Sequence, residues 1–271
     1  MCGRYAAAKN ANTLIEEFDV DESKVEHELP ADYNVAPTKE VYAVLDRKPD
    51  EAPDDAPTER QLRVVKWGLV PSWAKDPSIG SRMINARSET LAEKPAFRRA
   101  FGKRRCLLPA DGFYEWYTPQ GGTAEKTAKG KPKKQPFFIH RADRHSLAMA
   151  GLFEWWHDDT RGEEDPRAWL LSATIITTDA TDAVGRIHDR MPVVIAAEDW
   201  KRWLDPGVNE RSELEAMMRP ALATNLEAFP VSTAVNNVRN NGPELVEPLA
   251  LDEAVAGSVG DDGFWPPPST A

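Results

Sequence analysis

The sequence predicts an α+β protein with a mostly antiparallel, barrel-like β core and peripheral helices. Short apolar runs of strand length dominate the chain and follow one another directly. They lack the regular alternation with helices that is typical of a parallel sheet. A chain of 271 residues can bury one substantial core, so we expect a single domain over residues 2–250. Residues 251–271 contain several glycines and a Pro-Pro-Pro run, which predicts a disordered tail.

Short and long strands, with a few helices between them, are expected in the first half of the chain. A strand over 4–8 precedes a helix over 14–18 that begins near Asn12 or Thr13 as its cap. Residues 83–90 predict a short strand that runs into a helix capped at Ser88. Longer strands are expected over 40–46, 62–70 and 105–117, the last with an internal break at 109–112, and a helix over 95–101.

The second half contains the most apolar strands. They are expected over 136–140, 147–156 and 169–177, with shorter ones over 193–196 and 229–235 and helices over 179–187, 197–204 and 210–218. Residues 118–135 are rich in glycine and lysine, which predicts a flexible hairpin tip. Its lysines are Lys126, Lys129, Lys131, Lys133 and Lys134.

The charge of the chain is negative as a whole and positive in one stretch. A net charge of −10 argues by itself against a nucleic-acid partner. Residues 82–105, however, hold eight basic and two acidic residues, so this stretch carries +6 and the remainder −16. Such a stretch fits a local anion-binding surface, and the simpler alternative is a solvated helix face.

Composition also indicates which cellular compartment suits the protein and whether it binds a cofactor. Two cysteines cannot form a disulfide scaffold, and Cys106 stands in an apolar run, which suits a reducing interior. No signal sequence and no run long enough to span a bilayer is visible, so we expect a soluble, cytoplasmic protein without a membrane partner. The five histidines are scattered without metal-ligand spacing. We therefore expect no metal and no cofactor.

The amino terminus offers an unusual nucleophile. Cys2 and Gly3 are small enough for Met1 to be trimmed, which would leave a free α-amine and a thiol on one residue. A thiolate is a strong nucleophile, and an α-amine with a pKa of about 8 is partly unprotonated near neutral pH. Such a pair can condense with an aldehyde to close a thiazolidine ring. The alternative is that Cys2 is a small apolar residue that opens a strand.

Three other positions carry polar side chains that a core does not need. Asn85, Arg87 and Glu89 alternate in a short strand and therefore face one way. Glu115 stands among three aromatic residues, where desolvation would raise its pKa toward that of a general acid or base. His188 lies in a loop beside charged residues. Each also has a structural explanation: an ion pair for Glu115, a helix cap for His188 and backbone hydrogen bonds for Asn85.

Six blocks of the chain, in order, resemble the signature blocks of the SOS-response-associated peptidase (SRAP) family. They cover most of residues 2 to about 240. The blocks are Met-Cys-Gly-Arg-Tyr at 1–5, Tyr-Asn-Val-Ala-Pro-Thr at 33–38, Trp-Gly-Leu-Val-Pro-Ser-Trp at 67–73, Ile-Asn-Ala-Arg-Ser-Glu-Thr at 84–90, Arg-Cys-Leu-Leu-Pro-Ala-Asp-Gly-Phe-Tyr-Glu-Trp at 105–116 and His-Asp-Arg-Met-Pro at 188–192.

The resemblance implies the SRAP fold and a role in the DNA damage response. Members of this family recognise abasic sites in single-stranded DNA and crosslink to them through the amino-terminal cysteine. By analogy, Cys2 would form a Schiff base and then a thiazolidine with the opened sugar. Asn85 would hold the amine or the sugar, Glu115 would shuttle protons, and His188 would assist ring opening and reversal.

The resemblance also implies a DNA-binding set. Arg4 and Arg87 would hold phosphates beside the lesion. Trp67 and Trp116, with Pro37, would stack on or wedge between bases, and Asn34 completes the set. The expected partner is single-stranded DNA with abasic sites, with replication-fork proteins as further candidates, and the expected state is a monomer.

Two other functions stay open at this point. The chain could be a cysteine peptidase, including a self-processing one, with Cys2 as nucleophile and Glu115 or His188 as base. It could also be a noncatalytic reader of modified or single-stranded DNA. As a crosslinking protein or as a peptidase, it would be an enzyme of lyase or hydrolase type.

Overall fold

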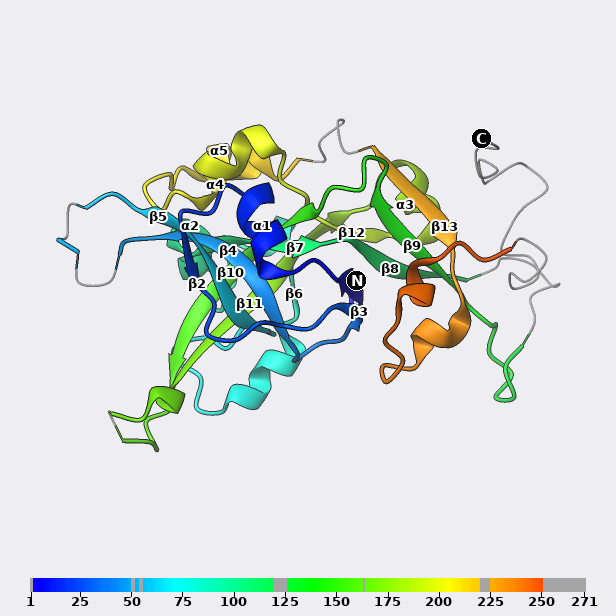
Figure 1. Cartoon of the computed structure of the whole chain (residues 1–271), viewed down its shortest axis with the longest axis horizontal. Helices are drawn as coiled ribbons and strands as arrows, with labels where there is room; N and C mark the ends of the chain where they lie inside the picture. Colours follow the sequence, from blue (N-terminus) through cyan, green and yellow to red (C-terminus); the bar gives the residue numbers. More distant parts are fainter. Residues whose placement is uncertain are drawn as a thin grey trace.

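Two β-sheets form the fold (Figure 1). The computed structural model describes residues 2–49, 52–53, 56–118, 126–162, 164–219 and 225–250. The tail expected over 251–271 lies outside the described residues, so its disorder and the end of the domain remain predictions.

The larger sheet closes into a barrel. Along the path β11-β10-β7-β4-β5 all neighbouring strands are antiparallel, and a parallel pair between β11 and β5 closes the ring. The predicted α+β fold with a mostly antiparallel, barrel-like core is therefore confirmed. The barrel strands are β4 (Glu40–Arg47), β5 (Glu59–Trp67), β7 (Arg105–Ala110), β10 (Leu147–His157) and β11 (Trp169–Asp179).

Three short strands extend this sheet. β2 (Glu22–Lys24) pairs with β5, whereas β6 (Asn85–Arg87) and β12 (Arg190–Pro192) both pair with β11. Thr177 of β11 lies opposite residues of both β6 and β12. Two sequence blocks about a hundred residues apart, 84–90 and 188–192, thus flank the same end of β11.

The smaller sheet is antiparallel throughout its described strands. Its order is β13-β9-β8-β1-β3. The break predicted at 109–112 is the point where the chain leaves the barrel, because only Asp111 separates β7 from β8. The strands are β1 (Tyr5–Ala7), β3 (Asp32–Val35), β8 (Gly112–Tyr117), β9 (Gln135–Arg141) and β13 (Leu226–Pro230).

Helices cover the outer face of the barrel, as the upper left of Figure 1 shows for α1, α4 and α5. Their apolar side chains share one core cluster with barrel residues that point outward, such as Leu62 and Leu107. A fifth helix, α3 (Asp182–Ile187), contacts β8, β12 and β13. The covering helices are α1 (Ala11–Glu17), α2 (Arg98–Lys103), α4 (Trp200–Leu204) and α5 (Arg211–Met217).

Two helix boundaries differ from the expected ones. The cap of α1 is Asn10, whose side chain accepts the backbone N–H of Thr13 at 2.9 Å, so the helix begins earlier than Asn12. Ser88 opens only a single 3₁₀ turn, Ser88–Thr90, and α2 begins ten residues later at Arg98. Short polar side chains cap turns and helices alike, which is why the sequence did not distinguish them.

The barrel interior continues into the smaller sheet. Inward residues of the barrel such as Trp67, Met149 and Ile175 belong to one buried cluster with Cys2 and Phe113. Strand alternation explains this, since residues two apart on a strand face the same side. The amino-terminal segment is therefore part of the main core.

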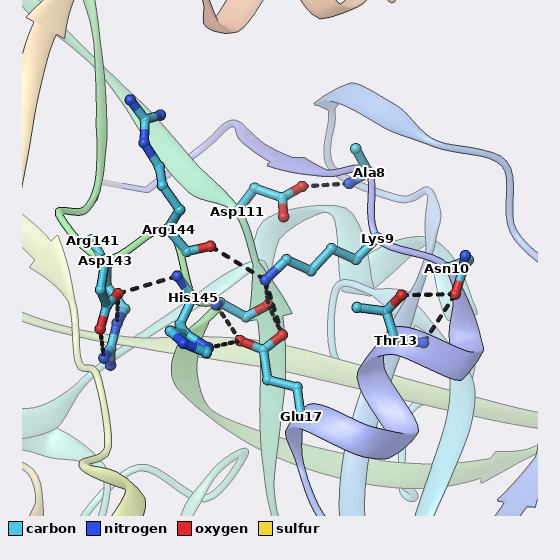
Figure 2. Close-up of polar contacts among 11 residues, drawn as sticks. Ala8, Lys9, Asn10, Thr13, Glu17, Asp111, Arg141, Asp143, Arg144 and His145 are labelled. Atoms are coloured by element: carbon cyan, nitrogen blue, oxygen red, sulfur yellow. Dashed lines mark hydrogen bonds and ion pairs between the residues drawn. The ribbon is translucent and has the colours of Figure 1, made fainter.

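A polar clamp fixes the chain just after β1 (Figure 2). Asp111 accepts the backbone N–H of Ala8 at 2.6 Å. The ammonium of Lys9 lies 2.9 Å from the Glu17 carboxylate of α1 and 3.0 Å from Ser146 Oγ. Glu17 in turn accepts the N–H and the hydroxyl of Ser146 at the start of β10. The contacts tie β1 and α1 to both sheets and so fix the course of residues 2–4.

Gly68, directly after β5, should be intolerant of a side chain. Its φ is +127°, and a Cβ there would lie 2.6 Å from the carbonyl oxygen of Gly80. We expect Gly68→Ala to lower the free energy of unfolding by about 2 kcal/mol or more. The alanine would hold a strained backbone conformation, and its Cβ would overlap with the carbonyl oxygen. Urea unfolding midpoints provide the measurement.

Gly102→Ala is the matched control. Gly102 lies in α2, and a Cβ there would meet nothing within 4 Å. Alanine favours helix over glycine by about 0.5–1 kcal/mol, so this variant should be at least as stable as the parent. Equal midpoints for both variants would contradict the account of Gly68.

Candidate functional site

Four predicted residues converge from three parts of the fold. Asn85 at the start of β6 donates its side-chain N–H to the carbonyl oxygen of Cys2 at 2.7 Å. His188, which follows α3, has its Nε2 3.8 Å from Oε2 of Glu115 in β8. The negative charge of Glu115 acts on the Cys2 thiol as well. The barrel, the smaller sheet and the loop after α3 thus each supply part of one cluster.

The Cys2 thiol is protonated at neutral pH. The residue is fully buried, and burial, together with the charge of Glu115, raises the pKa of its thiol far above the usual value. A hydrogen bond from the backbone N–H of Arg4 acts in the opposite direction with less effect. A reaction at this sulfur therefore requires a neighbouring group that accepts its proton.

Glu115 has the properties of such a group. Its side chain is 3% exposed, and burial raises its pKa to about 7. At neutral pH the carboxyl is divided between its protonated and ionised forms. It can accept or donate a proton without a large energetic cost in either direction. The aromatic neighbours of Glu115 predict a raised pKa, and the burial of its carboxyl in the structure agrees with that prediction.

His188 is held in a defined orientation by the residues that follow it. Its Nδ1 accepts the backbone N–H of Arg190 at 3.0 Å, which places the proton of the neutral ring on Nε2, toward Glu115. Burial lowers the pKa of the ring, so the neutral form prevails at pH 7. The Asp189 carboxylate lies 2.8 Å from the same Nδ1 and can pair with it once the ring is protonated.

Asn85 has one satisfied and one open hydrogen-bonding atom. Its Oδ1 is buried and has no hydrogen-bond partner among the residues that the structure describes. Buried acceptors rarely remain unpaired, so an amine or hydroxyl of a bound molecule, or a water, would complete it. Ala86 beside it is buried and Arg87 is exposed, which agrees with the expected alternation along β6.

Arg4 and Asn34 contact protein rather than open surface. Arg4 donates to Asn34 Oδ1 at 2.7 Å and to the carbonyl of Val235 at 3.0 Å. Asn34 is fully buried, and its amide also donates to the carbonyls of Asn237 and Asn240. The DNA contact predicted for Asn34 does not fit this burial. Its side chain instead fixes the loop over 235–240.

Trp67 also departs from its predicted role. It has no exposed surface, packs edge-on against Tyr5 at 5.1 Å between ring centroids, and donates its indole N–H to Ile84. Base stacking by Trp67 is therefore wrong for this conformation, since neither ring face is open. Large aromatic residues are used in cores and in nucleic-acid sites alike, so residue type did not decide between them.

Four residues of the predicted DNA-binding set reach the surface, and Arg4 is one of them, since it is partly exposed. Arg87 is exposed, and Pro37 and Trp116 are partly exposed. The indole N–H of Trp116 donates to Asn236 at 2.6 Å, and the guanidinium of Arg4 lies over the ring at 5.8 Å. Trp116 follows Glu115 on β8, so the two side chains lie on opposite faces of the strand.

A groove that the sequence did not predict begins at Trp116. It encloses about 690 Å³ between Trp116, Asn236 and the hairpin over 126–134. The available signal was the hairpin composition, which has five lysines and no acid in nine residues. The same composition is typical of a flexible loop, so it does not by itself indicate a groove.

The basic stretch over 82–105 divides into a buried and an exposed part. Arg105 is 1% exposed and donates to five backbone carbonyls, among them those of Trp203 and Asp205. Arg104 pairs with Glu154 at 2.6 Å. Neither belongs to a free anion-binding surface. The exposed members are Arg82, Arg87, Lys94, Arg98, Arg99 and Lys103.

The described part of the chain offers neither a membrane-spanning helix nor a cluster of metal ligands. None of the helices there is both long and apolar enough to cross a bilayer. No group of three or more His, Cys, Asp or Glu side chains in those residues is placed to hold a metal ion.

Known proteins with similar sequences and structures place this chain in a family. The model of the family "SOS response associated peptidase (SRAP)" matches residues 1–238. Abasic site processing protein YoqW of Bacillus subtilis (strain 168) is 38% identical over 247 residues, which cover 91% of this chain and 99% of that protein. Abasic site processing protein HMCES of Gallus gallus is 34% identical over 93% of this chain and 79% of that protein.

A solved structure supports the same assignment at the level of the fold. A protein from Bacteroides thetaiotaomicron, 23% identical, superposes with a TM-score of 0.73 over 92% of this chain and 100% of that one. Given the match of the family model over most of its length, the chain belongs to the SOS response associated peptidase (SRAP) family.

Proposed function

We propose that this protein senses abasic sites in single-stranded DNA and forms a covalent DNA–protein crosslink through Cys2 once Met1 has been removed. The observation that carries the proposal is the convergence of buried Cys2 and Glu115 with partly exposed Asn85 and His188 in one cluster. The names of the relatives, abasic site processing proteins, supply the substrate class. The crosslink would shield the lesion during the DNA damage response.

The chemistry requires an aldehyde and the two functional groups of Cys2. The free α-amine adds to the C1 aldehyde of the ring-opened sugar, and loss of water gives a Schiff base. The thiol then adds to the imine carbon while its proton passes to the nitrogen, which closes the thiazolidine. Aldehyde and aminothiol thus give thiazolidine and water, and no oxidant or metal takes part.

Each neighbour has a defined part in this sequence. Protonated Glu115 donates the proton that lets water leave, and ionised Glu115 accepts the thiol proton, which a pKa of about 7 permits. Asn85 Nδ2 holds the Cys2 backbone, and Oδ1 accepts from the amine or from a sugar hydroxyl. Neutral His188 assists sugar ring opening beside Glu115.

Exposed residues around the cluster would position the DNA. Arg87 contacts a phosphate, and Trp116 and Pro37 contact bases next to the lesion. The guanidinium of Arg4 packs on the ring of Trp116 and contributes a positive charge close to the bound strand. We keep replication-fork proteins and a monomeric state as predictions.

The peptidase hypothesis has less support. Catalytic thiolates of peptidases have a pKa lowered by a neighbouring cation or a helix amino terminus. Burial and the negative charge of Glu115 raise the pKa of the Cys2 thiol instead. A reaction between an amine, an aldehyde and a neutral thiol fits this environment better than attack by a thiolate on a peptide bond.

A crosslinking assay tests the proposal. Incubation with a single-stranded oligonucleotide that contains one abasic site should give a denaturant-resistant band, and Cys2→Ala should abolish it. Cys2→Ser keeps the amine and lacks the thiol, so it should give a band only after borohydride reduction of the Schiff base. Intact mass measured beforehand establishes that Met1 is absent.

Other outcomes would favour the alternatives. A band of equal intensity for Cys2→Ala and the parent protein would contradict the crosslinking proposal. Equal affinity for abasic and intact strands without covalent product indicates a noncatalytic reader. Peptide turnover that disappears in Cys2→Ser supports a peptidase.

The pH dependence of crosslinking should depend on Glu115. If its protonated form assists the loss of water, the rate should fall as the pH rises through about 7. Glu115→Gln cannot exchange a proton, so it should lower the rate by about 100-fold and remove this part of the profile. Single-turnover rates between pH 5.5 and 8.5, at saturating DNA, measure both effects.

Glu227→Gln serves as the matched control, because Glu227 is an exposed carboxyl on β13. It should retain the rate and the pH profile of the parent. A parental pH profile in Glu115→Gln would rule out Glu115 as the proton donor.

A further inference from the structure

The groove beside Trp116 has walls of two different kinds. Trp116 and Asn236 form one wall and are joined by the hydrogen bond between them. The hairpin over 126–134 forms the other, with Lys129, Lys131 and Lys134. In Figure 1 this hairpin extends at the lower right, next to the segment drawn in orange that contains Asn236. One side of the groove is therefore aromatic and the other cationic.

The hairpin is built by its own hydrogen bonds. Thr127 donates its N–H to the carbonyl of Lys131, and its hydroxyl accepts the N–H of Lys131. Gly130 adopts a φ of +74°, the left-handed conformation that a tight turn requires. Lys126 and Pro132 form a β-bridge below it. The lysines are thus presented on a turn of defined shape.

The charge of the hairpin contrasts with that of the chain. Residues 126–134 carry +5 without an acidic residue, whereas the whole chain carries −10. All nine residues are exposed. A surface of this kind attracts a polyanion locally, although the remainder of the protein repels it.

The groove and the candidate site meet at neighbouring residues of β8 and β9. Trp116 is adjacent to Glu115, and Lys134 directly precedes β9, the strand that pairs with β8 at both residues. Burial raises the pKa of Glu115 and lowers that of His188, and the positive charge of Lys134 acts on both: it opposes the rise at Glu115 and adds to the fall at His188. Lys134, which lines the groove, is therefore close enough to act electrostatically on Glu115 and His188.

We propose that this groove binds the single strand of DNA on one side of the abasic nucleotide, with Lys129 and Lys131 on phosphates and the adjoining base against Trp116. This inference rests on the proposed function, because it assigns a path to the same substrate. The combination of an aromatic face and lysines is typical of sequence-independent binding to single strands. An acidic peptide would use the lysines and leave the aromatic wall without a specific partner.

The test uses Lys129→Ala/Lys131→Ala, which leaves Lys134 and the catalytic cluster unchanged. The matched control is Lys48→Ala/Lys201→Ala, which removes the same charge after β4 and from α4. Fluorescence anisotropy with an intact oligonucleotide gives affinity as a function of salt. Loss of two phosphate contacts should reduce the slope of log K against log salt by about 1.4. The control should keep the parental slope.

Two abasic oligonucleotides then locate the contact. One carries nucleotides only on the 5′ side of the lesion, and the other only on the 3′ side. At subsaturating DNA the groove variant should crosslink one of them several-fold more slowly and the other at the parental rate. At saturating DNA both rates should equal those of the parent, since the chemical groups are intact.

Several results would overturn the inference. They are an unchanged slope, an equal loss on both oligonucleotides, the same loss in the control variant, or weaker binding of poly-glutamate with DNA affinity retained. If the parent forms no crosslink and the groove variant still shows the reduced slope, the proposed function fails and the groove stands as a DNA-binding surface.

Discussion

The hydrogen bond between Asn85 and the carbonyl of Cys2 joins the parts on which the site depends. Asn85 belongs to the barrel through β6, whereas Cys2 leads into β1 of the smaller sheet. β1 has only three residues, too few to hold its position by its own burial. Pairing with β3 and β8, together with the hydrogen bond from Ala8 to Asp111, holds β1 in place. The reactive residue is thus positioned by tertiary contacts more than by local structure.

Burial shifts the three titratable members of the cluster toward their neutral forms. The pKa of the Cys2 thiol and that of Glu115 are raised, and the pKa of His188 is lowered. Desolvation is the first cause in each case, because a charged group loses more hydration than a neutral one. Under the proposed function, a condensation that begins and ends with neutral species needs only the transient charge that proton exchange with Glu115 provides. This environment is the physical reason for which we propose an aldehyde, and not a peptide bond, as the substrate.

The sequence predicted much of the fold and part of the site. Strand-length runs and their lack of alternation with helices led to the barrel, and the resemblance led to the cluster around Cys2. The roles of Asn34, Trp67 and Arg105 were not accessible, because each residue type is common both in binding surfaces and in buried networks. Only the partner atoms, such as the loop carbonyls around Asn34, distinguish the two. Those atoms come from residues up to 206 positions away in the chain.

The distribution of charge is compatible with the proposed binding of an anionic strand by an acidic chain. Groups of exposed cations occur on the lysine hairpin and on the surface around Arg87 and α2, whereas the net charge is −10. Repulsion from the whole chain acts over long distances, and salt screens it beyond a Debye length of about 10 Å at 0.1 M. Contacts between a lysine and a phosphate act at short range and are weakened by counterion competition instead. Salt therefore reduces both the repulsion and the contacts, so the affinity for DNA should fall less steeply with salt than the number of phosphate contacts alone implies.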